Sequence, residues 1–193
     1  MEHKPYHHGD LRNSLIEAGI ELINTEGEKQ FSLRKVSKLC GVSQAAPYSH
    51  FKDKEDLLRA MQEHVTNKFV KSLEEVTHLY PNKNDERAIC EMGIRYVMFF
   101  INNPQYFHFL FSQPCMEINI SIGENEIDSY PPFEILKRTV FNVFKESGMS
   151  KEKMEEKIIS LWATVHGLAS IATMKGVNYN KDWETTIKNI IRN

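Results

Sequence analysis

The chain has 193 residues, 41% of them hydrophobic and 26% charged, with a formal net charge of −2. This composition is sufficient for a buried core and excludes an intrinsically disordered chain, while the near-neutral charge excludes a polycation that binds nucleic acid along its whole length. The N-terminal stretch has no apolar signal core and no run of about 18 apolar residues occurs, so we expect neither secretion nor membrane insertion.

The three cysteines give no sign of a disulfide framework or a metal site. Cys40, Cys90 and Cys115 are odd in number, far apart and without C-x-x-C spacing. This usage suits a reducing compartment, and we expect a cytoplasmic protein with no metal and no cofactor. Cys40 falls on an apolar helix face and is expected to pack there as a small hydrophobic residue.

The first two expected helices precede Gly41. Asp10 is placed to cap the first helix, whose apolar residues keep a helical period until Gly27 ends it. Ser32 is placed to cap the second helix, and Gly41 follows its last apolar residue. The apolar face of this second helix comprises Leu33, Val36, Leu39 and Cys40.

A third short helix is expected to begin at Ser43, after the turn at Gly41. Its first turn contains Gln44, Ala45 and Ala46. Small residues there let a helix approach base edges, and a glutamine can pair bidentately with adenine. Pro47 lies close to this first turn, where a missing N–H matters little, so we expect the helix to tolerate it. The two helices form a helix-turn-helix pattern, which predicts sequence-specific DNA binding.

Charge supports this interpretation locally. Residues 29–54 contain six basic residues and one acidic residue, Asp53. The basic residues are Lys29, Arg34, Lys35, Lys38, Lys52 and Lys54. A solvated helix face would also explain such a run. Its coincidence with a helix-turn-helix favours attraction to phosphate, which dominates the affinity of proteins for DNA.

The rest of the chain also has helical spacing. A long helix is expected after Asp53, with Asp56 near the capping-box position, and Pro81 is expected to end it. Further expected elements are a helix at 87–102, an aromatic segment at 106–111, a loop at 115–130, and helices at 133–147, 151–174 and about 183–191. These patterns predict an all-α protein.

The strings EAGIELINTEG, SLRKVSKLCGVS and YSHFKDKEDLL, within about residues 8–60, resemble the TetR family of bacterial transcription regulators. The last string closely matches that family's Y-x-H-F-x-x-K-E-x-L ending. PQYFHFLF and LWATVHGLASI resemble the branch named for a Trp-His-Gly (WHG) signature, here Trp162, His166 and Gly167. The resemblance implies a helix-turn-helix DNA-binding domain at 1–53, with the linking helix starting up to about 60, and a helical ligand-binding and dimerisation domain at 54–193.

The resemblance further implies a homodimer whose recognition helices enter successive major grooves of a pseudo-palindromic operator. The residues expected to contact double-stranded DNA are Ser32, Arg34, Gln44, Ala45, Ala46, Tyr48, His50 and Lys54. Lys4, His7 and His8 could reach the backbone or the minor groove. Two alternatives stay open: Tyr48 could pack against the first helix, and His50 could be a surface histidine without a role.

The aromatic density of residues 96–111 indicates either an ordinary aromatic core or the apolar ligand pocket that the resemblance implies. The residues expected to contact a ligand are Tyr96, Phe100, Phe107, Phe111, Trp162 and His166. His166 could instead be a hydrogen-bonded core residue, and Gly167 is expected to permit close helix packing. The last two helices are expected to form the dimer interface, or alternatively to complete a monomer core.

These observations lead us to expect a repressor that releases its operator on binding a small apolar or aromatic ligand. A DNA-binding regulator of the same fold without a small-molecule effector is the alternative. The sequence contains no G-x-S-x-G, H-E-x-x-H or phosphate-loop motif, so an enzyme is not expected.

Overall fold

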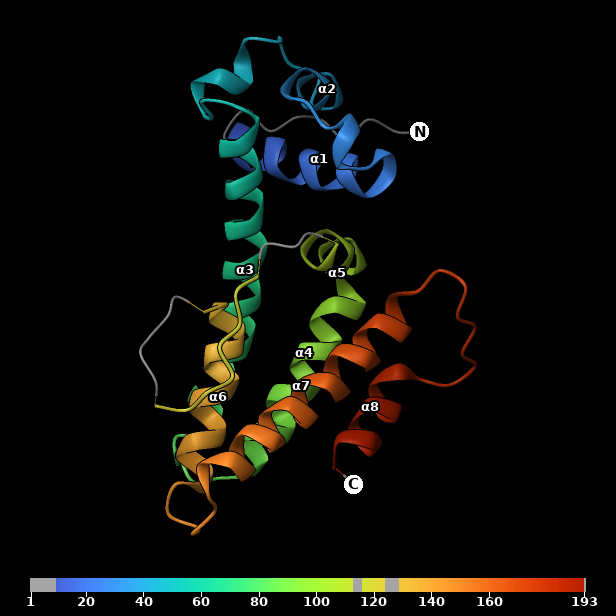
Figure 1. The fold of residues 1–193 in the computed structure, drawn as a ribbon. Coiled ribbons are helices and arrows are strands. Elements are labelled where there is room, and N and C mark those ends of the chain that lie inside the picture. Colours follow the sequence, from blue (N-terminus) through green and yellow to red (C-terminus); the bar gives the residue numbers. More distant parts are fainter. Residues whose placement is uncertain (1–9, 113–115, 124–128, 193) are drawn as a thin grey trace. The chain divides into compact units, whose positions relative to one another are not determined.

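The computed structural model describes residues 10–112, 116–123 and 129–192, which form helices without any strand (Figure 1). This confirms the predicted all-α fold. The elements are α1 (Leu11–Glu26), η1 (Glu28–Gln30), α2 (Leu33–Leu39), η2 (Ala46–Ser49), α3 (Lys54–Leu79), α4 (Arg87–Asn102), α5 (Pro104–Phe111), α6 (Pro131–Phe144), α7 (Lys151–Thr173) and α8 (Trp183–Arg192), where η marks a short 3₁₀ helix.

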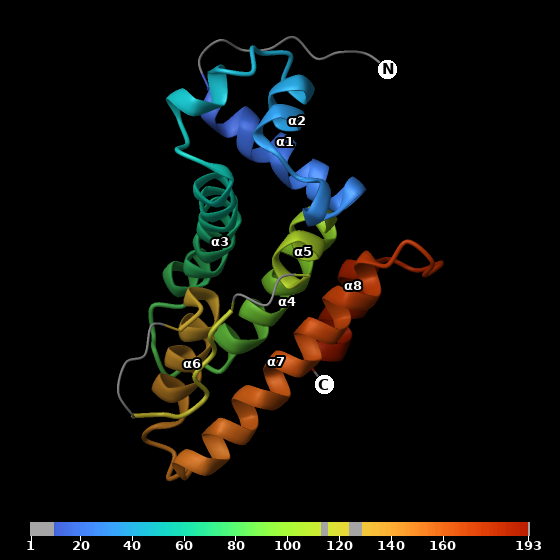
Figure 2. The same cartoon turned by 45° about the horizontal axis from the view of Figure 1, so that its top comes forward.

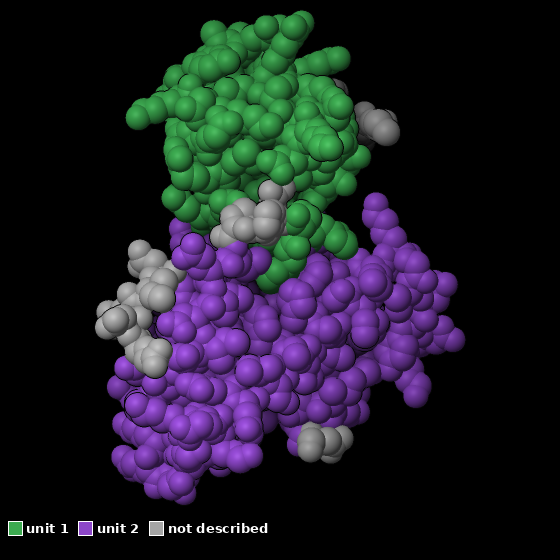
Figure 3. Space-filling model, in the orientation of Figure 1, with its two compact units in different colours: residues 1–65, 108–112 green, residues 66–107, 113–193 purple. Residues whose placement is uncertain are grey.

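The chain packs as two compact units (Figure 3). The first comprises residues 1–65 and 108–112, and the second comprises residues 66–107 and 113–193. The division falls inside α3 and inside α5, so each of these helices contributes to both units. The functional division into residues 1–53 and 54–193 remains a prediction, because packing alone does not assign a role to either part.

Predicted helix caps are present where the chain offers a short polar side chain. Asp10 accepts a hydrogen bond from the backbone N–H of Asn13, and the Ser32 hydroxyl accepts one from Lys35. At the start of α3, Asp53 Oδ1 accepts from the N–H of Asp56 at 2.8 Å. Asp56 Oδ2 accepts in return from the N–H of Lys52 at 3.0 Å. These reciprocal bonds satisfy backbone donors that a helix start leaves without partners.

In the first unit, α1 packs closely against the start of α3. A side chain at Gly19 would place its Cβ 2.8 Å from the sulfur of Met61, so only glycine fits there without a shift. Nε2 of His64 lies 2.8 Å from the Glu17 carboxylate and ties the same two helices together. The unit's apolar core comprises Leu15, Ile16, Ile20, Phe31, Val36, Phe51, Leu57 and Met61.

The helix expected to begin at Ser43 is not a regular α-helix, and this prediction was wrong. The N–H of Ala46 donates to the carbonyl of Ser43, three residues back, and the 3₁₀ helix η2 follows. Pro47 has no N–H, so it cannot make the bond to Ser43 that an α-helix requires. The segment therefore closes by tighter three-residue bonds, including His50 N–H to Pro47 carbonyl at 3.0 Å.

Two side chains at the end of α2 and just after it also depart from expectation. Leu39 is 50% exposed rather than part of the buried face. Cys40 is half-buried, with its sulfur 3.5 Å from the carbonyl oxygen of Ser14, and burial raises the pKa of its thiol. The buried residues of this helix are therefore Leu33, Val36 and Ser37.

Helix α6 begins and ends earlier than the predicted 133–147. It starts at Pro131, because a proline fits the first helical positions, where its missing N–H has no partner to lose. It ends at Phe144, three residues before the predicted end, and the turn continues to Gly148 at φ +77°. Cys115, Lys4, His7 and His8 lie outside the described residues.

In the second unit, α4 contacts α6, α7 and α8, and Figures 1 and 2 both show α7 running alongside it. Gly93 lies at the closest approach. A Cβ added there would be 3.3 Å from both Val165 of α7 and Ile191 of α8. By contrast, a Cβ added at Gly167 would meet no atom within 4 Å, so the close packing expected at Gly167 does not occur within this chain.

Candidate DNA-binding surface and effector cavity

The segment from Gln44 to His50 presents its polar side chains to solvent. Gln44, Ala45 and His50 are exposed, and Tyr48 is 61% exposed rather than packed against α1. Within the same segment, Pro47 is buried. An exposed glutamine between small residues can approach base edges, and the tyrosine and histidine beside it can donate to phosphates.

Phe51, only 2% exposed, closes this segment against the core. Its N–H donates to the Pro47 carbonyl at 2.9 Å. The Arg12 guanidinium lies 5.4 Å from the centre of its ring. The exposed residues of the segment are thus carried on a fixed support, as a surface that reads DNA requires.

The basic residues of this region differ in whether their side chains are already bound within the protein. Within the described residues, the exposed Arg34, Lys38 and Lys52 make no side-chain hydrogen bond or ion pair. Lys35 is bound to the Glu26 carboxylate at 2.7 Å. Arg34 and Lys38 are therefore the more available for phosphate contacts. Lys52, by contrast, lowers the pKa of Asp56 through the hydrogen bond from its backbone N–H and, less strongly, through its charge.

Two further predicted DNA contacts have structural roles within the first unit. The Lys54 ammonium lies 3.4 Å from the Glu28 carbonyl and 5.7 Å from the ring centre of Phe31. The half-buried Ser32 hydroxyl accepts the capping bond from Lys35 and keeps its own proton for donation. Substituting either residue would therefore change packing or capping as well as any DNA contact.

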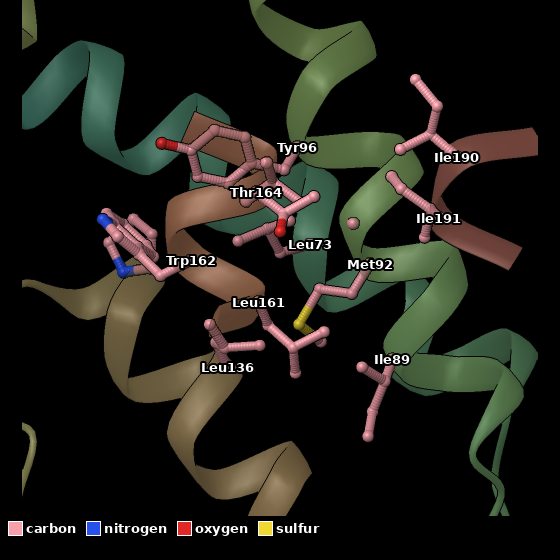
Figure 4. Close-up of a pocket in the computed structure, with 13 residues that line it drawn as sticks. Leu73, Ile89, Met92, Tyr96, Leu136, Leu161, Trp162, Thr164, Ile190 and Ile191 are labelled. Atoms are coloured by element: carbon pink, nitrogen blue, oxygen red, sulfur yellow. The ribbon is translucent and has the colours of Figure 1, made fainter. Parts of the chain in front are cut away.

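The second unit contains an apolar cavity of about 200 Å³ among α3, α4, α6, α7 and α8 (Figure 4). Its lining includes Met92, Tyr96, Leu161, Trp162, Ile190 and Ile191. In Figure 4 the Met92 side chain extends from α4 towards Leu161 of α7. The described residues that line the cavity include no charged side chain, and the hydroxyls and indole N–H come from Tyr96, Thr164 and Trp162. Such a space suits an uncharged apolar ligand.

Of the predicted ligand contacts, Tyr96 and Trp162 line this cavity, whereas Phe100 and Phe107 pack in an aromatic cluster beside it. The rings of Phe100 and Phe107 are 5.2 Å apart, and the Phe69 ring lies 4.8 Å from Phe100. The predicted aromatic density thus reflects mainly core packing. Phe111 belongs to the 108–112 segment of the first unit.

His166 stands behind the cavity rather than in its wall. Its Nδ1 lies 3.1 Å from the Tyr96 hydroxyl, and its ring centre is 5.2 Å from that of Phe107. Burial lowers the pKa of His166 from its ordinary value. Burial likewise raises the pKa of Tyr96, so both groups are neutral near pH 7.

Sequence reasoning missed several aliphatic residues of the cavity wall, among them Met92, Leu161 and Ile191. Their helical period marks them as buried but does not distinguish a residue that fills a core from one that borders an empty space. That distinction depends on how closely α4, α7 and α8 approach, which is decided by residues far apart in the chain.

Residues 15–61 match the family model for bacterial regulatory proteins of the tetR family. The chain carries a TetR-type DNA-binding domain. A search of curated proteins found no significant match. Among the described residues, no helix is both long and apolar enough to cross a membrane.

Solved TetR-family structures share the fold over nearly the whole chain. The fatty acid degradation regulator FadR from Bacillus halodurans is 14% identical, with 100% of this chain and 95% of that chain covered and a TM-score of 0.69. The TetR family regulator PfmR from Thermus thermophilus is 15% identical, with coverages of 94% and 93% and a TM-score of 0.67. A TetR-family regulator from Haemophilus influenzae is 22% identical, with 95% of both chains covered and a TM-score of 0.61.

Identities this low establish the fold alone. The sequence match to the tetR family model covers residues 15–61, and the shared fold of these regulators extends over nearly the whole chain.

Proposed function

We propose that this chain is a cytoplasmic, sequence-specific transcriptional repressor that binds a pseudo-palindromic operator as a homodimer and releases it on binding a small apolar or aromatic ligand. The observation that carries the DNA-binding part is the TetR-family match over residues 15–61. The exposed surface from Gln44 to His50, which lies within that match, supports it.

On this proposal, DNA contacts divide into two kinds. Gln44, with the small Ala45 and Ala46 beside it, reads base edges in the major groove. Backbone phosphates are bound by Ser32, Arg34, Tyr48, His50 and Lys54, with the exposed Lys38 and Lys52 adding to the attraction. Base contacts depend on the DNA sequence and phosphate contacts do not. Substitutions at the two groups of residues should therefore change specificity and overall affinity separately.

An exposed apolar surface on α7 and α8 supports the homodimer. Ile171 is 47% exposed and Ile190 is 45% exposed, and Ile159 on α7 is also exposed. Large aliphatic side chains exposed on these two helices favour burial against a second copy. Gly167, whose added Cβ would meet nothing in this chain, leaves room on α7 for a partner helix to approach closely.

The cavity beside Met92 is the proposed effector site. An uncharged apolar lining with a few hydroxyl and N–H groups favours a small neutral aromatic or aliphatic ligand. Trp162 lines the cavity, and His166, one turn further along the same face of α7, contacts the cavity residue Tyr96. Both belong to the Trp-His-Gly segment. We therefore assign the second unit to the WHG branch as part of the same proposal.

One observation favours the second candidate, a regulator of the same fold without a small-molecule effector. The cavity volume of about 200 Å³ is below the roughly 300–1,000 Å³ of typical ligand pockets. Native mass spectrometry of the freshly purified protein separates the two candidates. A co-purified mass released by denaturation supports the first, and a mass equal to the bare chain or its dimer supports the second.

Selection of bound DNA from a random pool tests the DNA-binding proposal directly. We expect enrichment of a pseudo-palindrome with half-sites roughly 34–36 Å apart along the helix. Affinity for the enriched site should fall with salt at a log–log slope of about −0.9 per phosphate neutralised. Equal affinity for the selected pool and for the starting pool would refute sequence-specific binding.

A further inference from the structure

A second hollow lies in the same unit, where the end of α3 and the α3–α4 connection meet α4 and α6. It has a volume of about 410 Å³, within the usual range for ligand sites. Its apolar part comprises Val76, Pro81, Ala88 and Met92. Its polar part includes Lys83, Arg138 and Asn142, together with Tyr80 and Asn82. We call this hollow the cationic cleft.

The charges that line the cationic cleft are of one sign. Lys83 and Arg138 contribute positive charges, and no acidic residue is among the described residues that line it. Within the described part of the chain, Lys83, Arg138 and Asn142 make no side-chain hydrogen bond or ion pair. Their donors are therefore available to a ligand rather than committed to the protein.

Two of the acids that lie near the cleft in sequence are held by partners of their own. Asp85 is bound by the Arg87 guanidinium at 2.7 Å. Glu146 lies 3.5 Å from the side-chain amide of Asn84. Neither of these acids lines the cleft, so neither competes inside it for the two cations.

We propose that the cationic cleft binds a small organic carboxylate, whose charged group is held by Arg138 and Lys83 and whose apolar body rests on Val76, Ala88 and Met92. Arginine presents two parallel N–H donors that match a carboxylate, and the amide of Asn142 on the next turn of α6 adds a further donor. The Arg87 guanidinium lies 5.8 Å from the ring centre of Tyr80, which also lines the cleft.

This site differs in chemistry from the effector cavity, which has no charged lining. A neutral apolar molecule suits that cavity, whereas the cleft requires a negative charge to match its two cations. The inference does not depend on DNA binding, since it rests on the second unit alone.

Benzoate is a suitable probe, because benzamide has the same shape without the charge and inorganic phosphate has charge without an apolar body. We expect ligand-observed NMR titrations at low ionic strength to show saturable benzoate binding that is at least tenfold tighter than benzamide binding. Arg138→Gln should weaken benzoate binding at least tenfold and Lys83→Gln severalfold.

Lys145→Gln is the matched control, because it removes an equal exposed charge from the end of the same helix outside the cleft. It should leave benzoate affinity unchanged, and all three variants should unfold at the wild-type temperature. Four results would overturn the proposal: no saturable benzoate binding, equal binding of benzamide, equal binding of phosphate, or benzoate binding that is insensitive to Arg138→Gln. The last would place benzoate in the effector cavity or elsewhere.

Discussion

The hydroxyl oxygen of Tyr96 lies 3.1 Å from Nδ1 of His166, which joins α4 to α7 inside the second unit. The Tyr96 ring meets Trp162 edge-on, with ring centres 5.4 Å apart. The hydroxyl and Nδ1 share one hydrogen bond, whose direction is set by the tautomer of the buried imidazole. The tyrosine is thus held in the cavity wall by a residue behind it.

This pair predicts a pH dependence of stability. The pKa of His166 is lowered from 6.5 in the folded chain, so the unfolded chain binds the proton first as pH falls. The free energy of unfolding contributed by this group is therefore present above about pH 6.5 and is lost below it. Thermal unfolding followed by circular dichroism should show a steeper loss on acidification for wild type than for His166→Gln. Identical pH profiles for the two proteins would contradict the prediction.

Arg34→Gln should weaken binding to all DNA sequences alike. Arg34 is exposed and makes no ion pair within the described residues, so its removal leaves the fold intact. The log–log salt slope should become less steep by about 0.9, the value for one phosphate contact. Fluorescence anisotropy at several salt concentrations measures both quantities, with Lys145→Gln as a charge-matched control in the other unit. A variant that loses affinity only for the selected operator would argue against a phosphate contact.

Gln44→Ala should instead relax the preference at one base pair in each half-site. Gln44 is exposed in the turn before η2, so the substitution removes no packing. Discrimination at that base pair should fall by about 1–3 kcal/mol, while affinity for random DNA stays unchanged. Competition binding with single-base operator variants provides the measurement. A uniform loss over all sequences would assign Gln44 to the backbone instead.

Asp53→Ala should destabilise the first unit by about 1 kcal/mol, because it removes the side-chain acceptor for the N–H of Asp56 at the start of α3. Chemical denaturation gives the free energy of unfolding. Glu55→Ala, an exposed acid in the same turn without a capping bond, serves as the control. Equal losses in the two variants would mean that the helix dipole, rather than the cap, accounts for the effect.

Ile171→Glu should convert the proposed homodimer into a monomer. The substitution places a charge in the exposed apolar surface of α7 without disturbing the buried core, since Ile171 is already half-exposed. Sedimentation velocity at micromolar concentration distinguishes the two species. Leu79→Glu, the same change at an exposed leucine near the end of α3, should leave the dimer intact. A wild-type protein that sediments as a monomer would refute the dimer and the palindrome together.

Local signals in the sequence were sufficient to predict most helix starts. Asp10, Ser32 and Ser150 each accept the bond from the third residue of the helix that follows, and such bonds involve only neighbouring residues. The prediction that an α-helix would tolerate Pro47 was wrong, because the number of hydrogen bonds that a proline removes depends on its distance from the start of the helix. Placed four residues after Ser43, it removes the very bond that would extend an α-helix past the first turn.

The effector cavity was predictable only in part. Tyr96 was identified from the aromatic density of residues 96–111, and Trp162 from the resemblance to the Trp-His-Gly branch. Whether an interior side chain borders a space or fills one depends on contacts between distant segments, such as Gly93 against Ile191. No sequence pattern predicts how closely these helices approach. The aliphatic residues of the cavity wall could therefore be identified only from the structure.

Met92 lines both the effector cavity and the cationic cleft, so one thioether side chain forms part of two different walls. Methionine is unbranched and adapts its rotamer readily, which makes this shared wall a soft one. A ligand that pushes Met92 from one side takes volume from the other side. A neutral molecule and a carboxylate that never touch would then compete through a single movable residue.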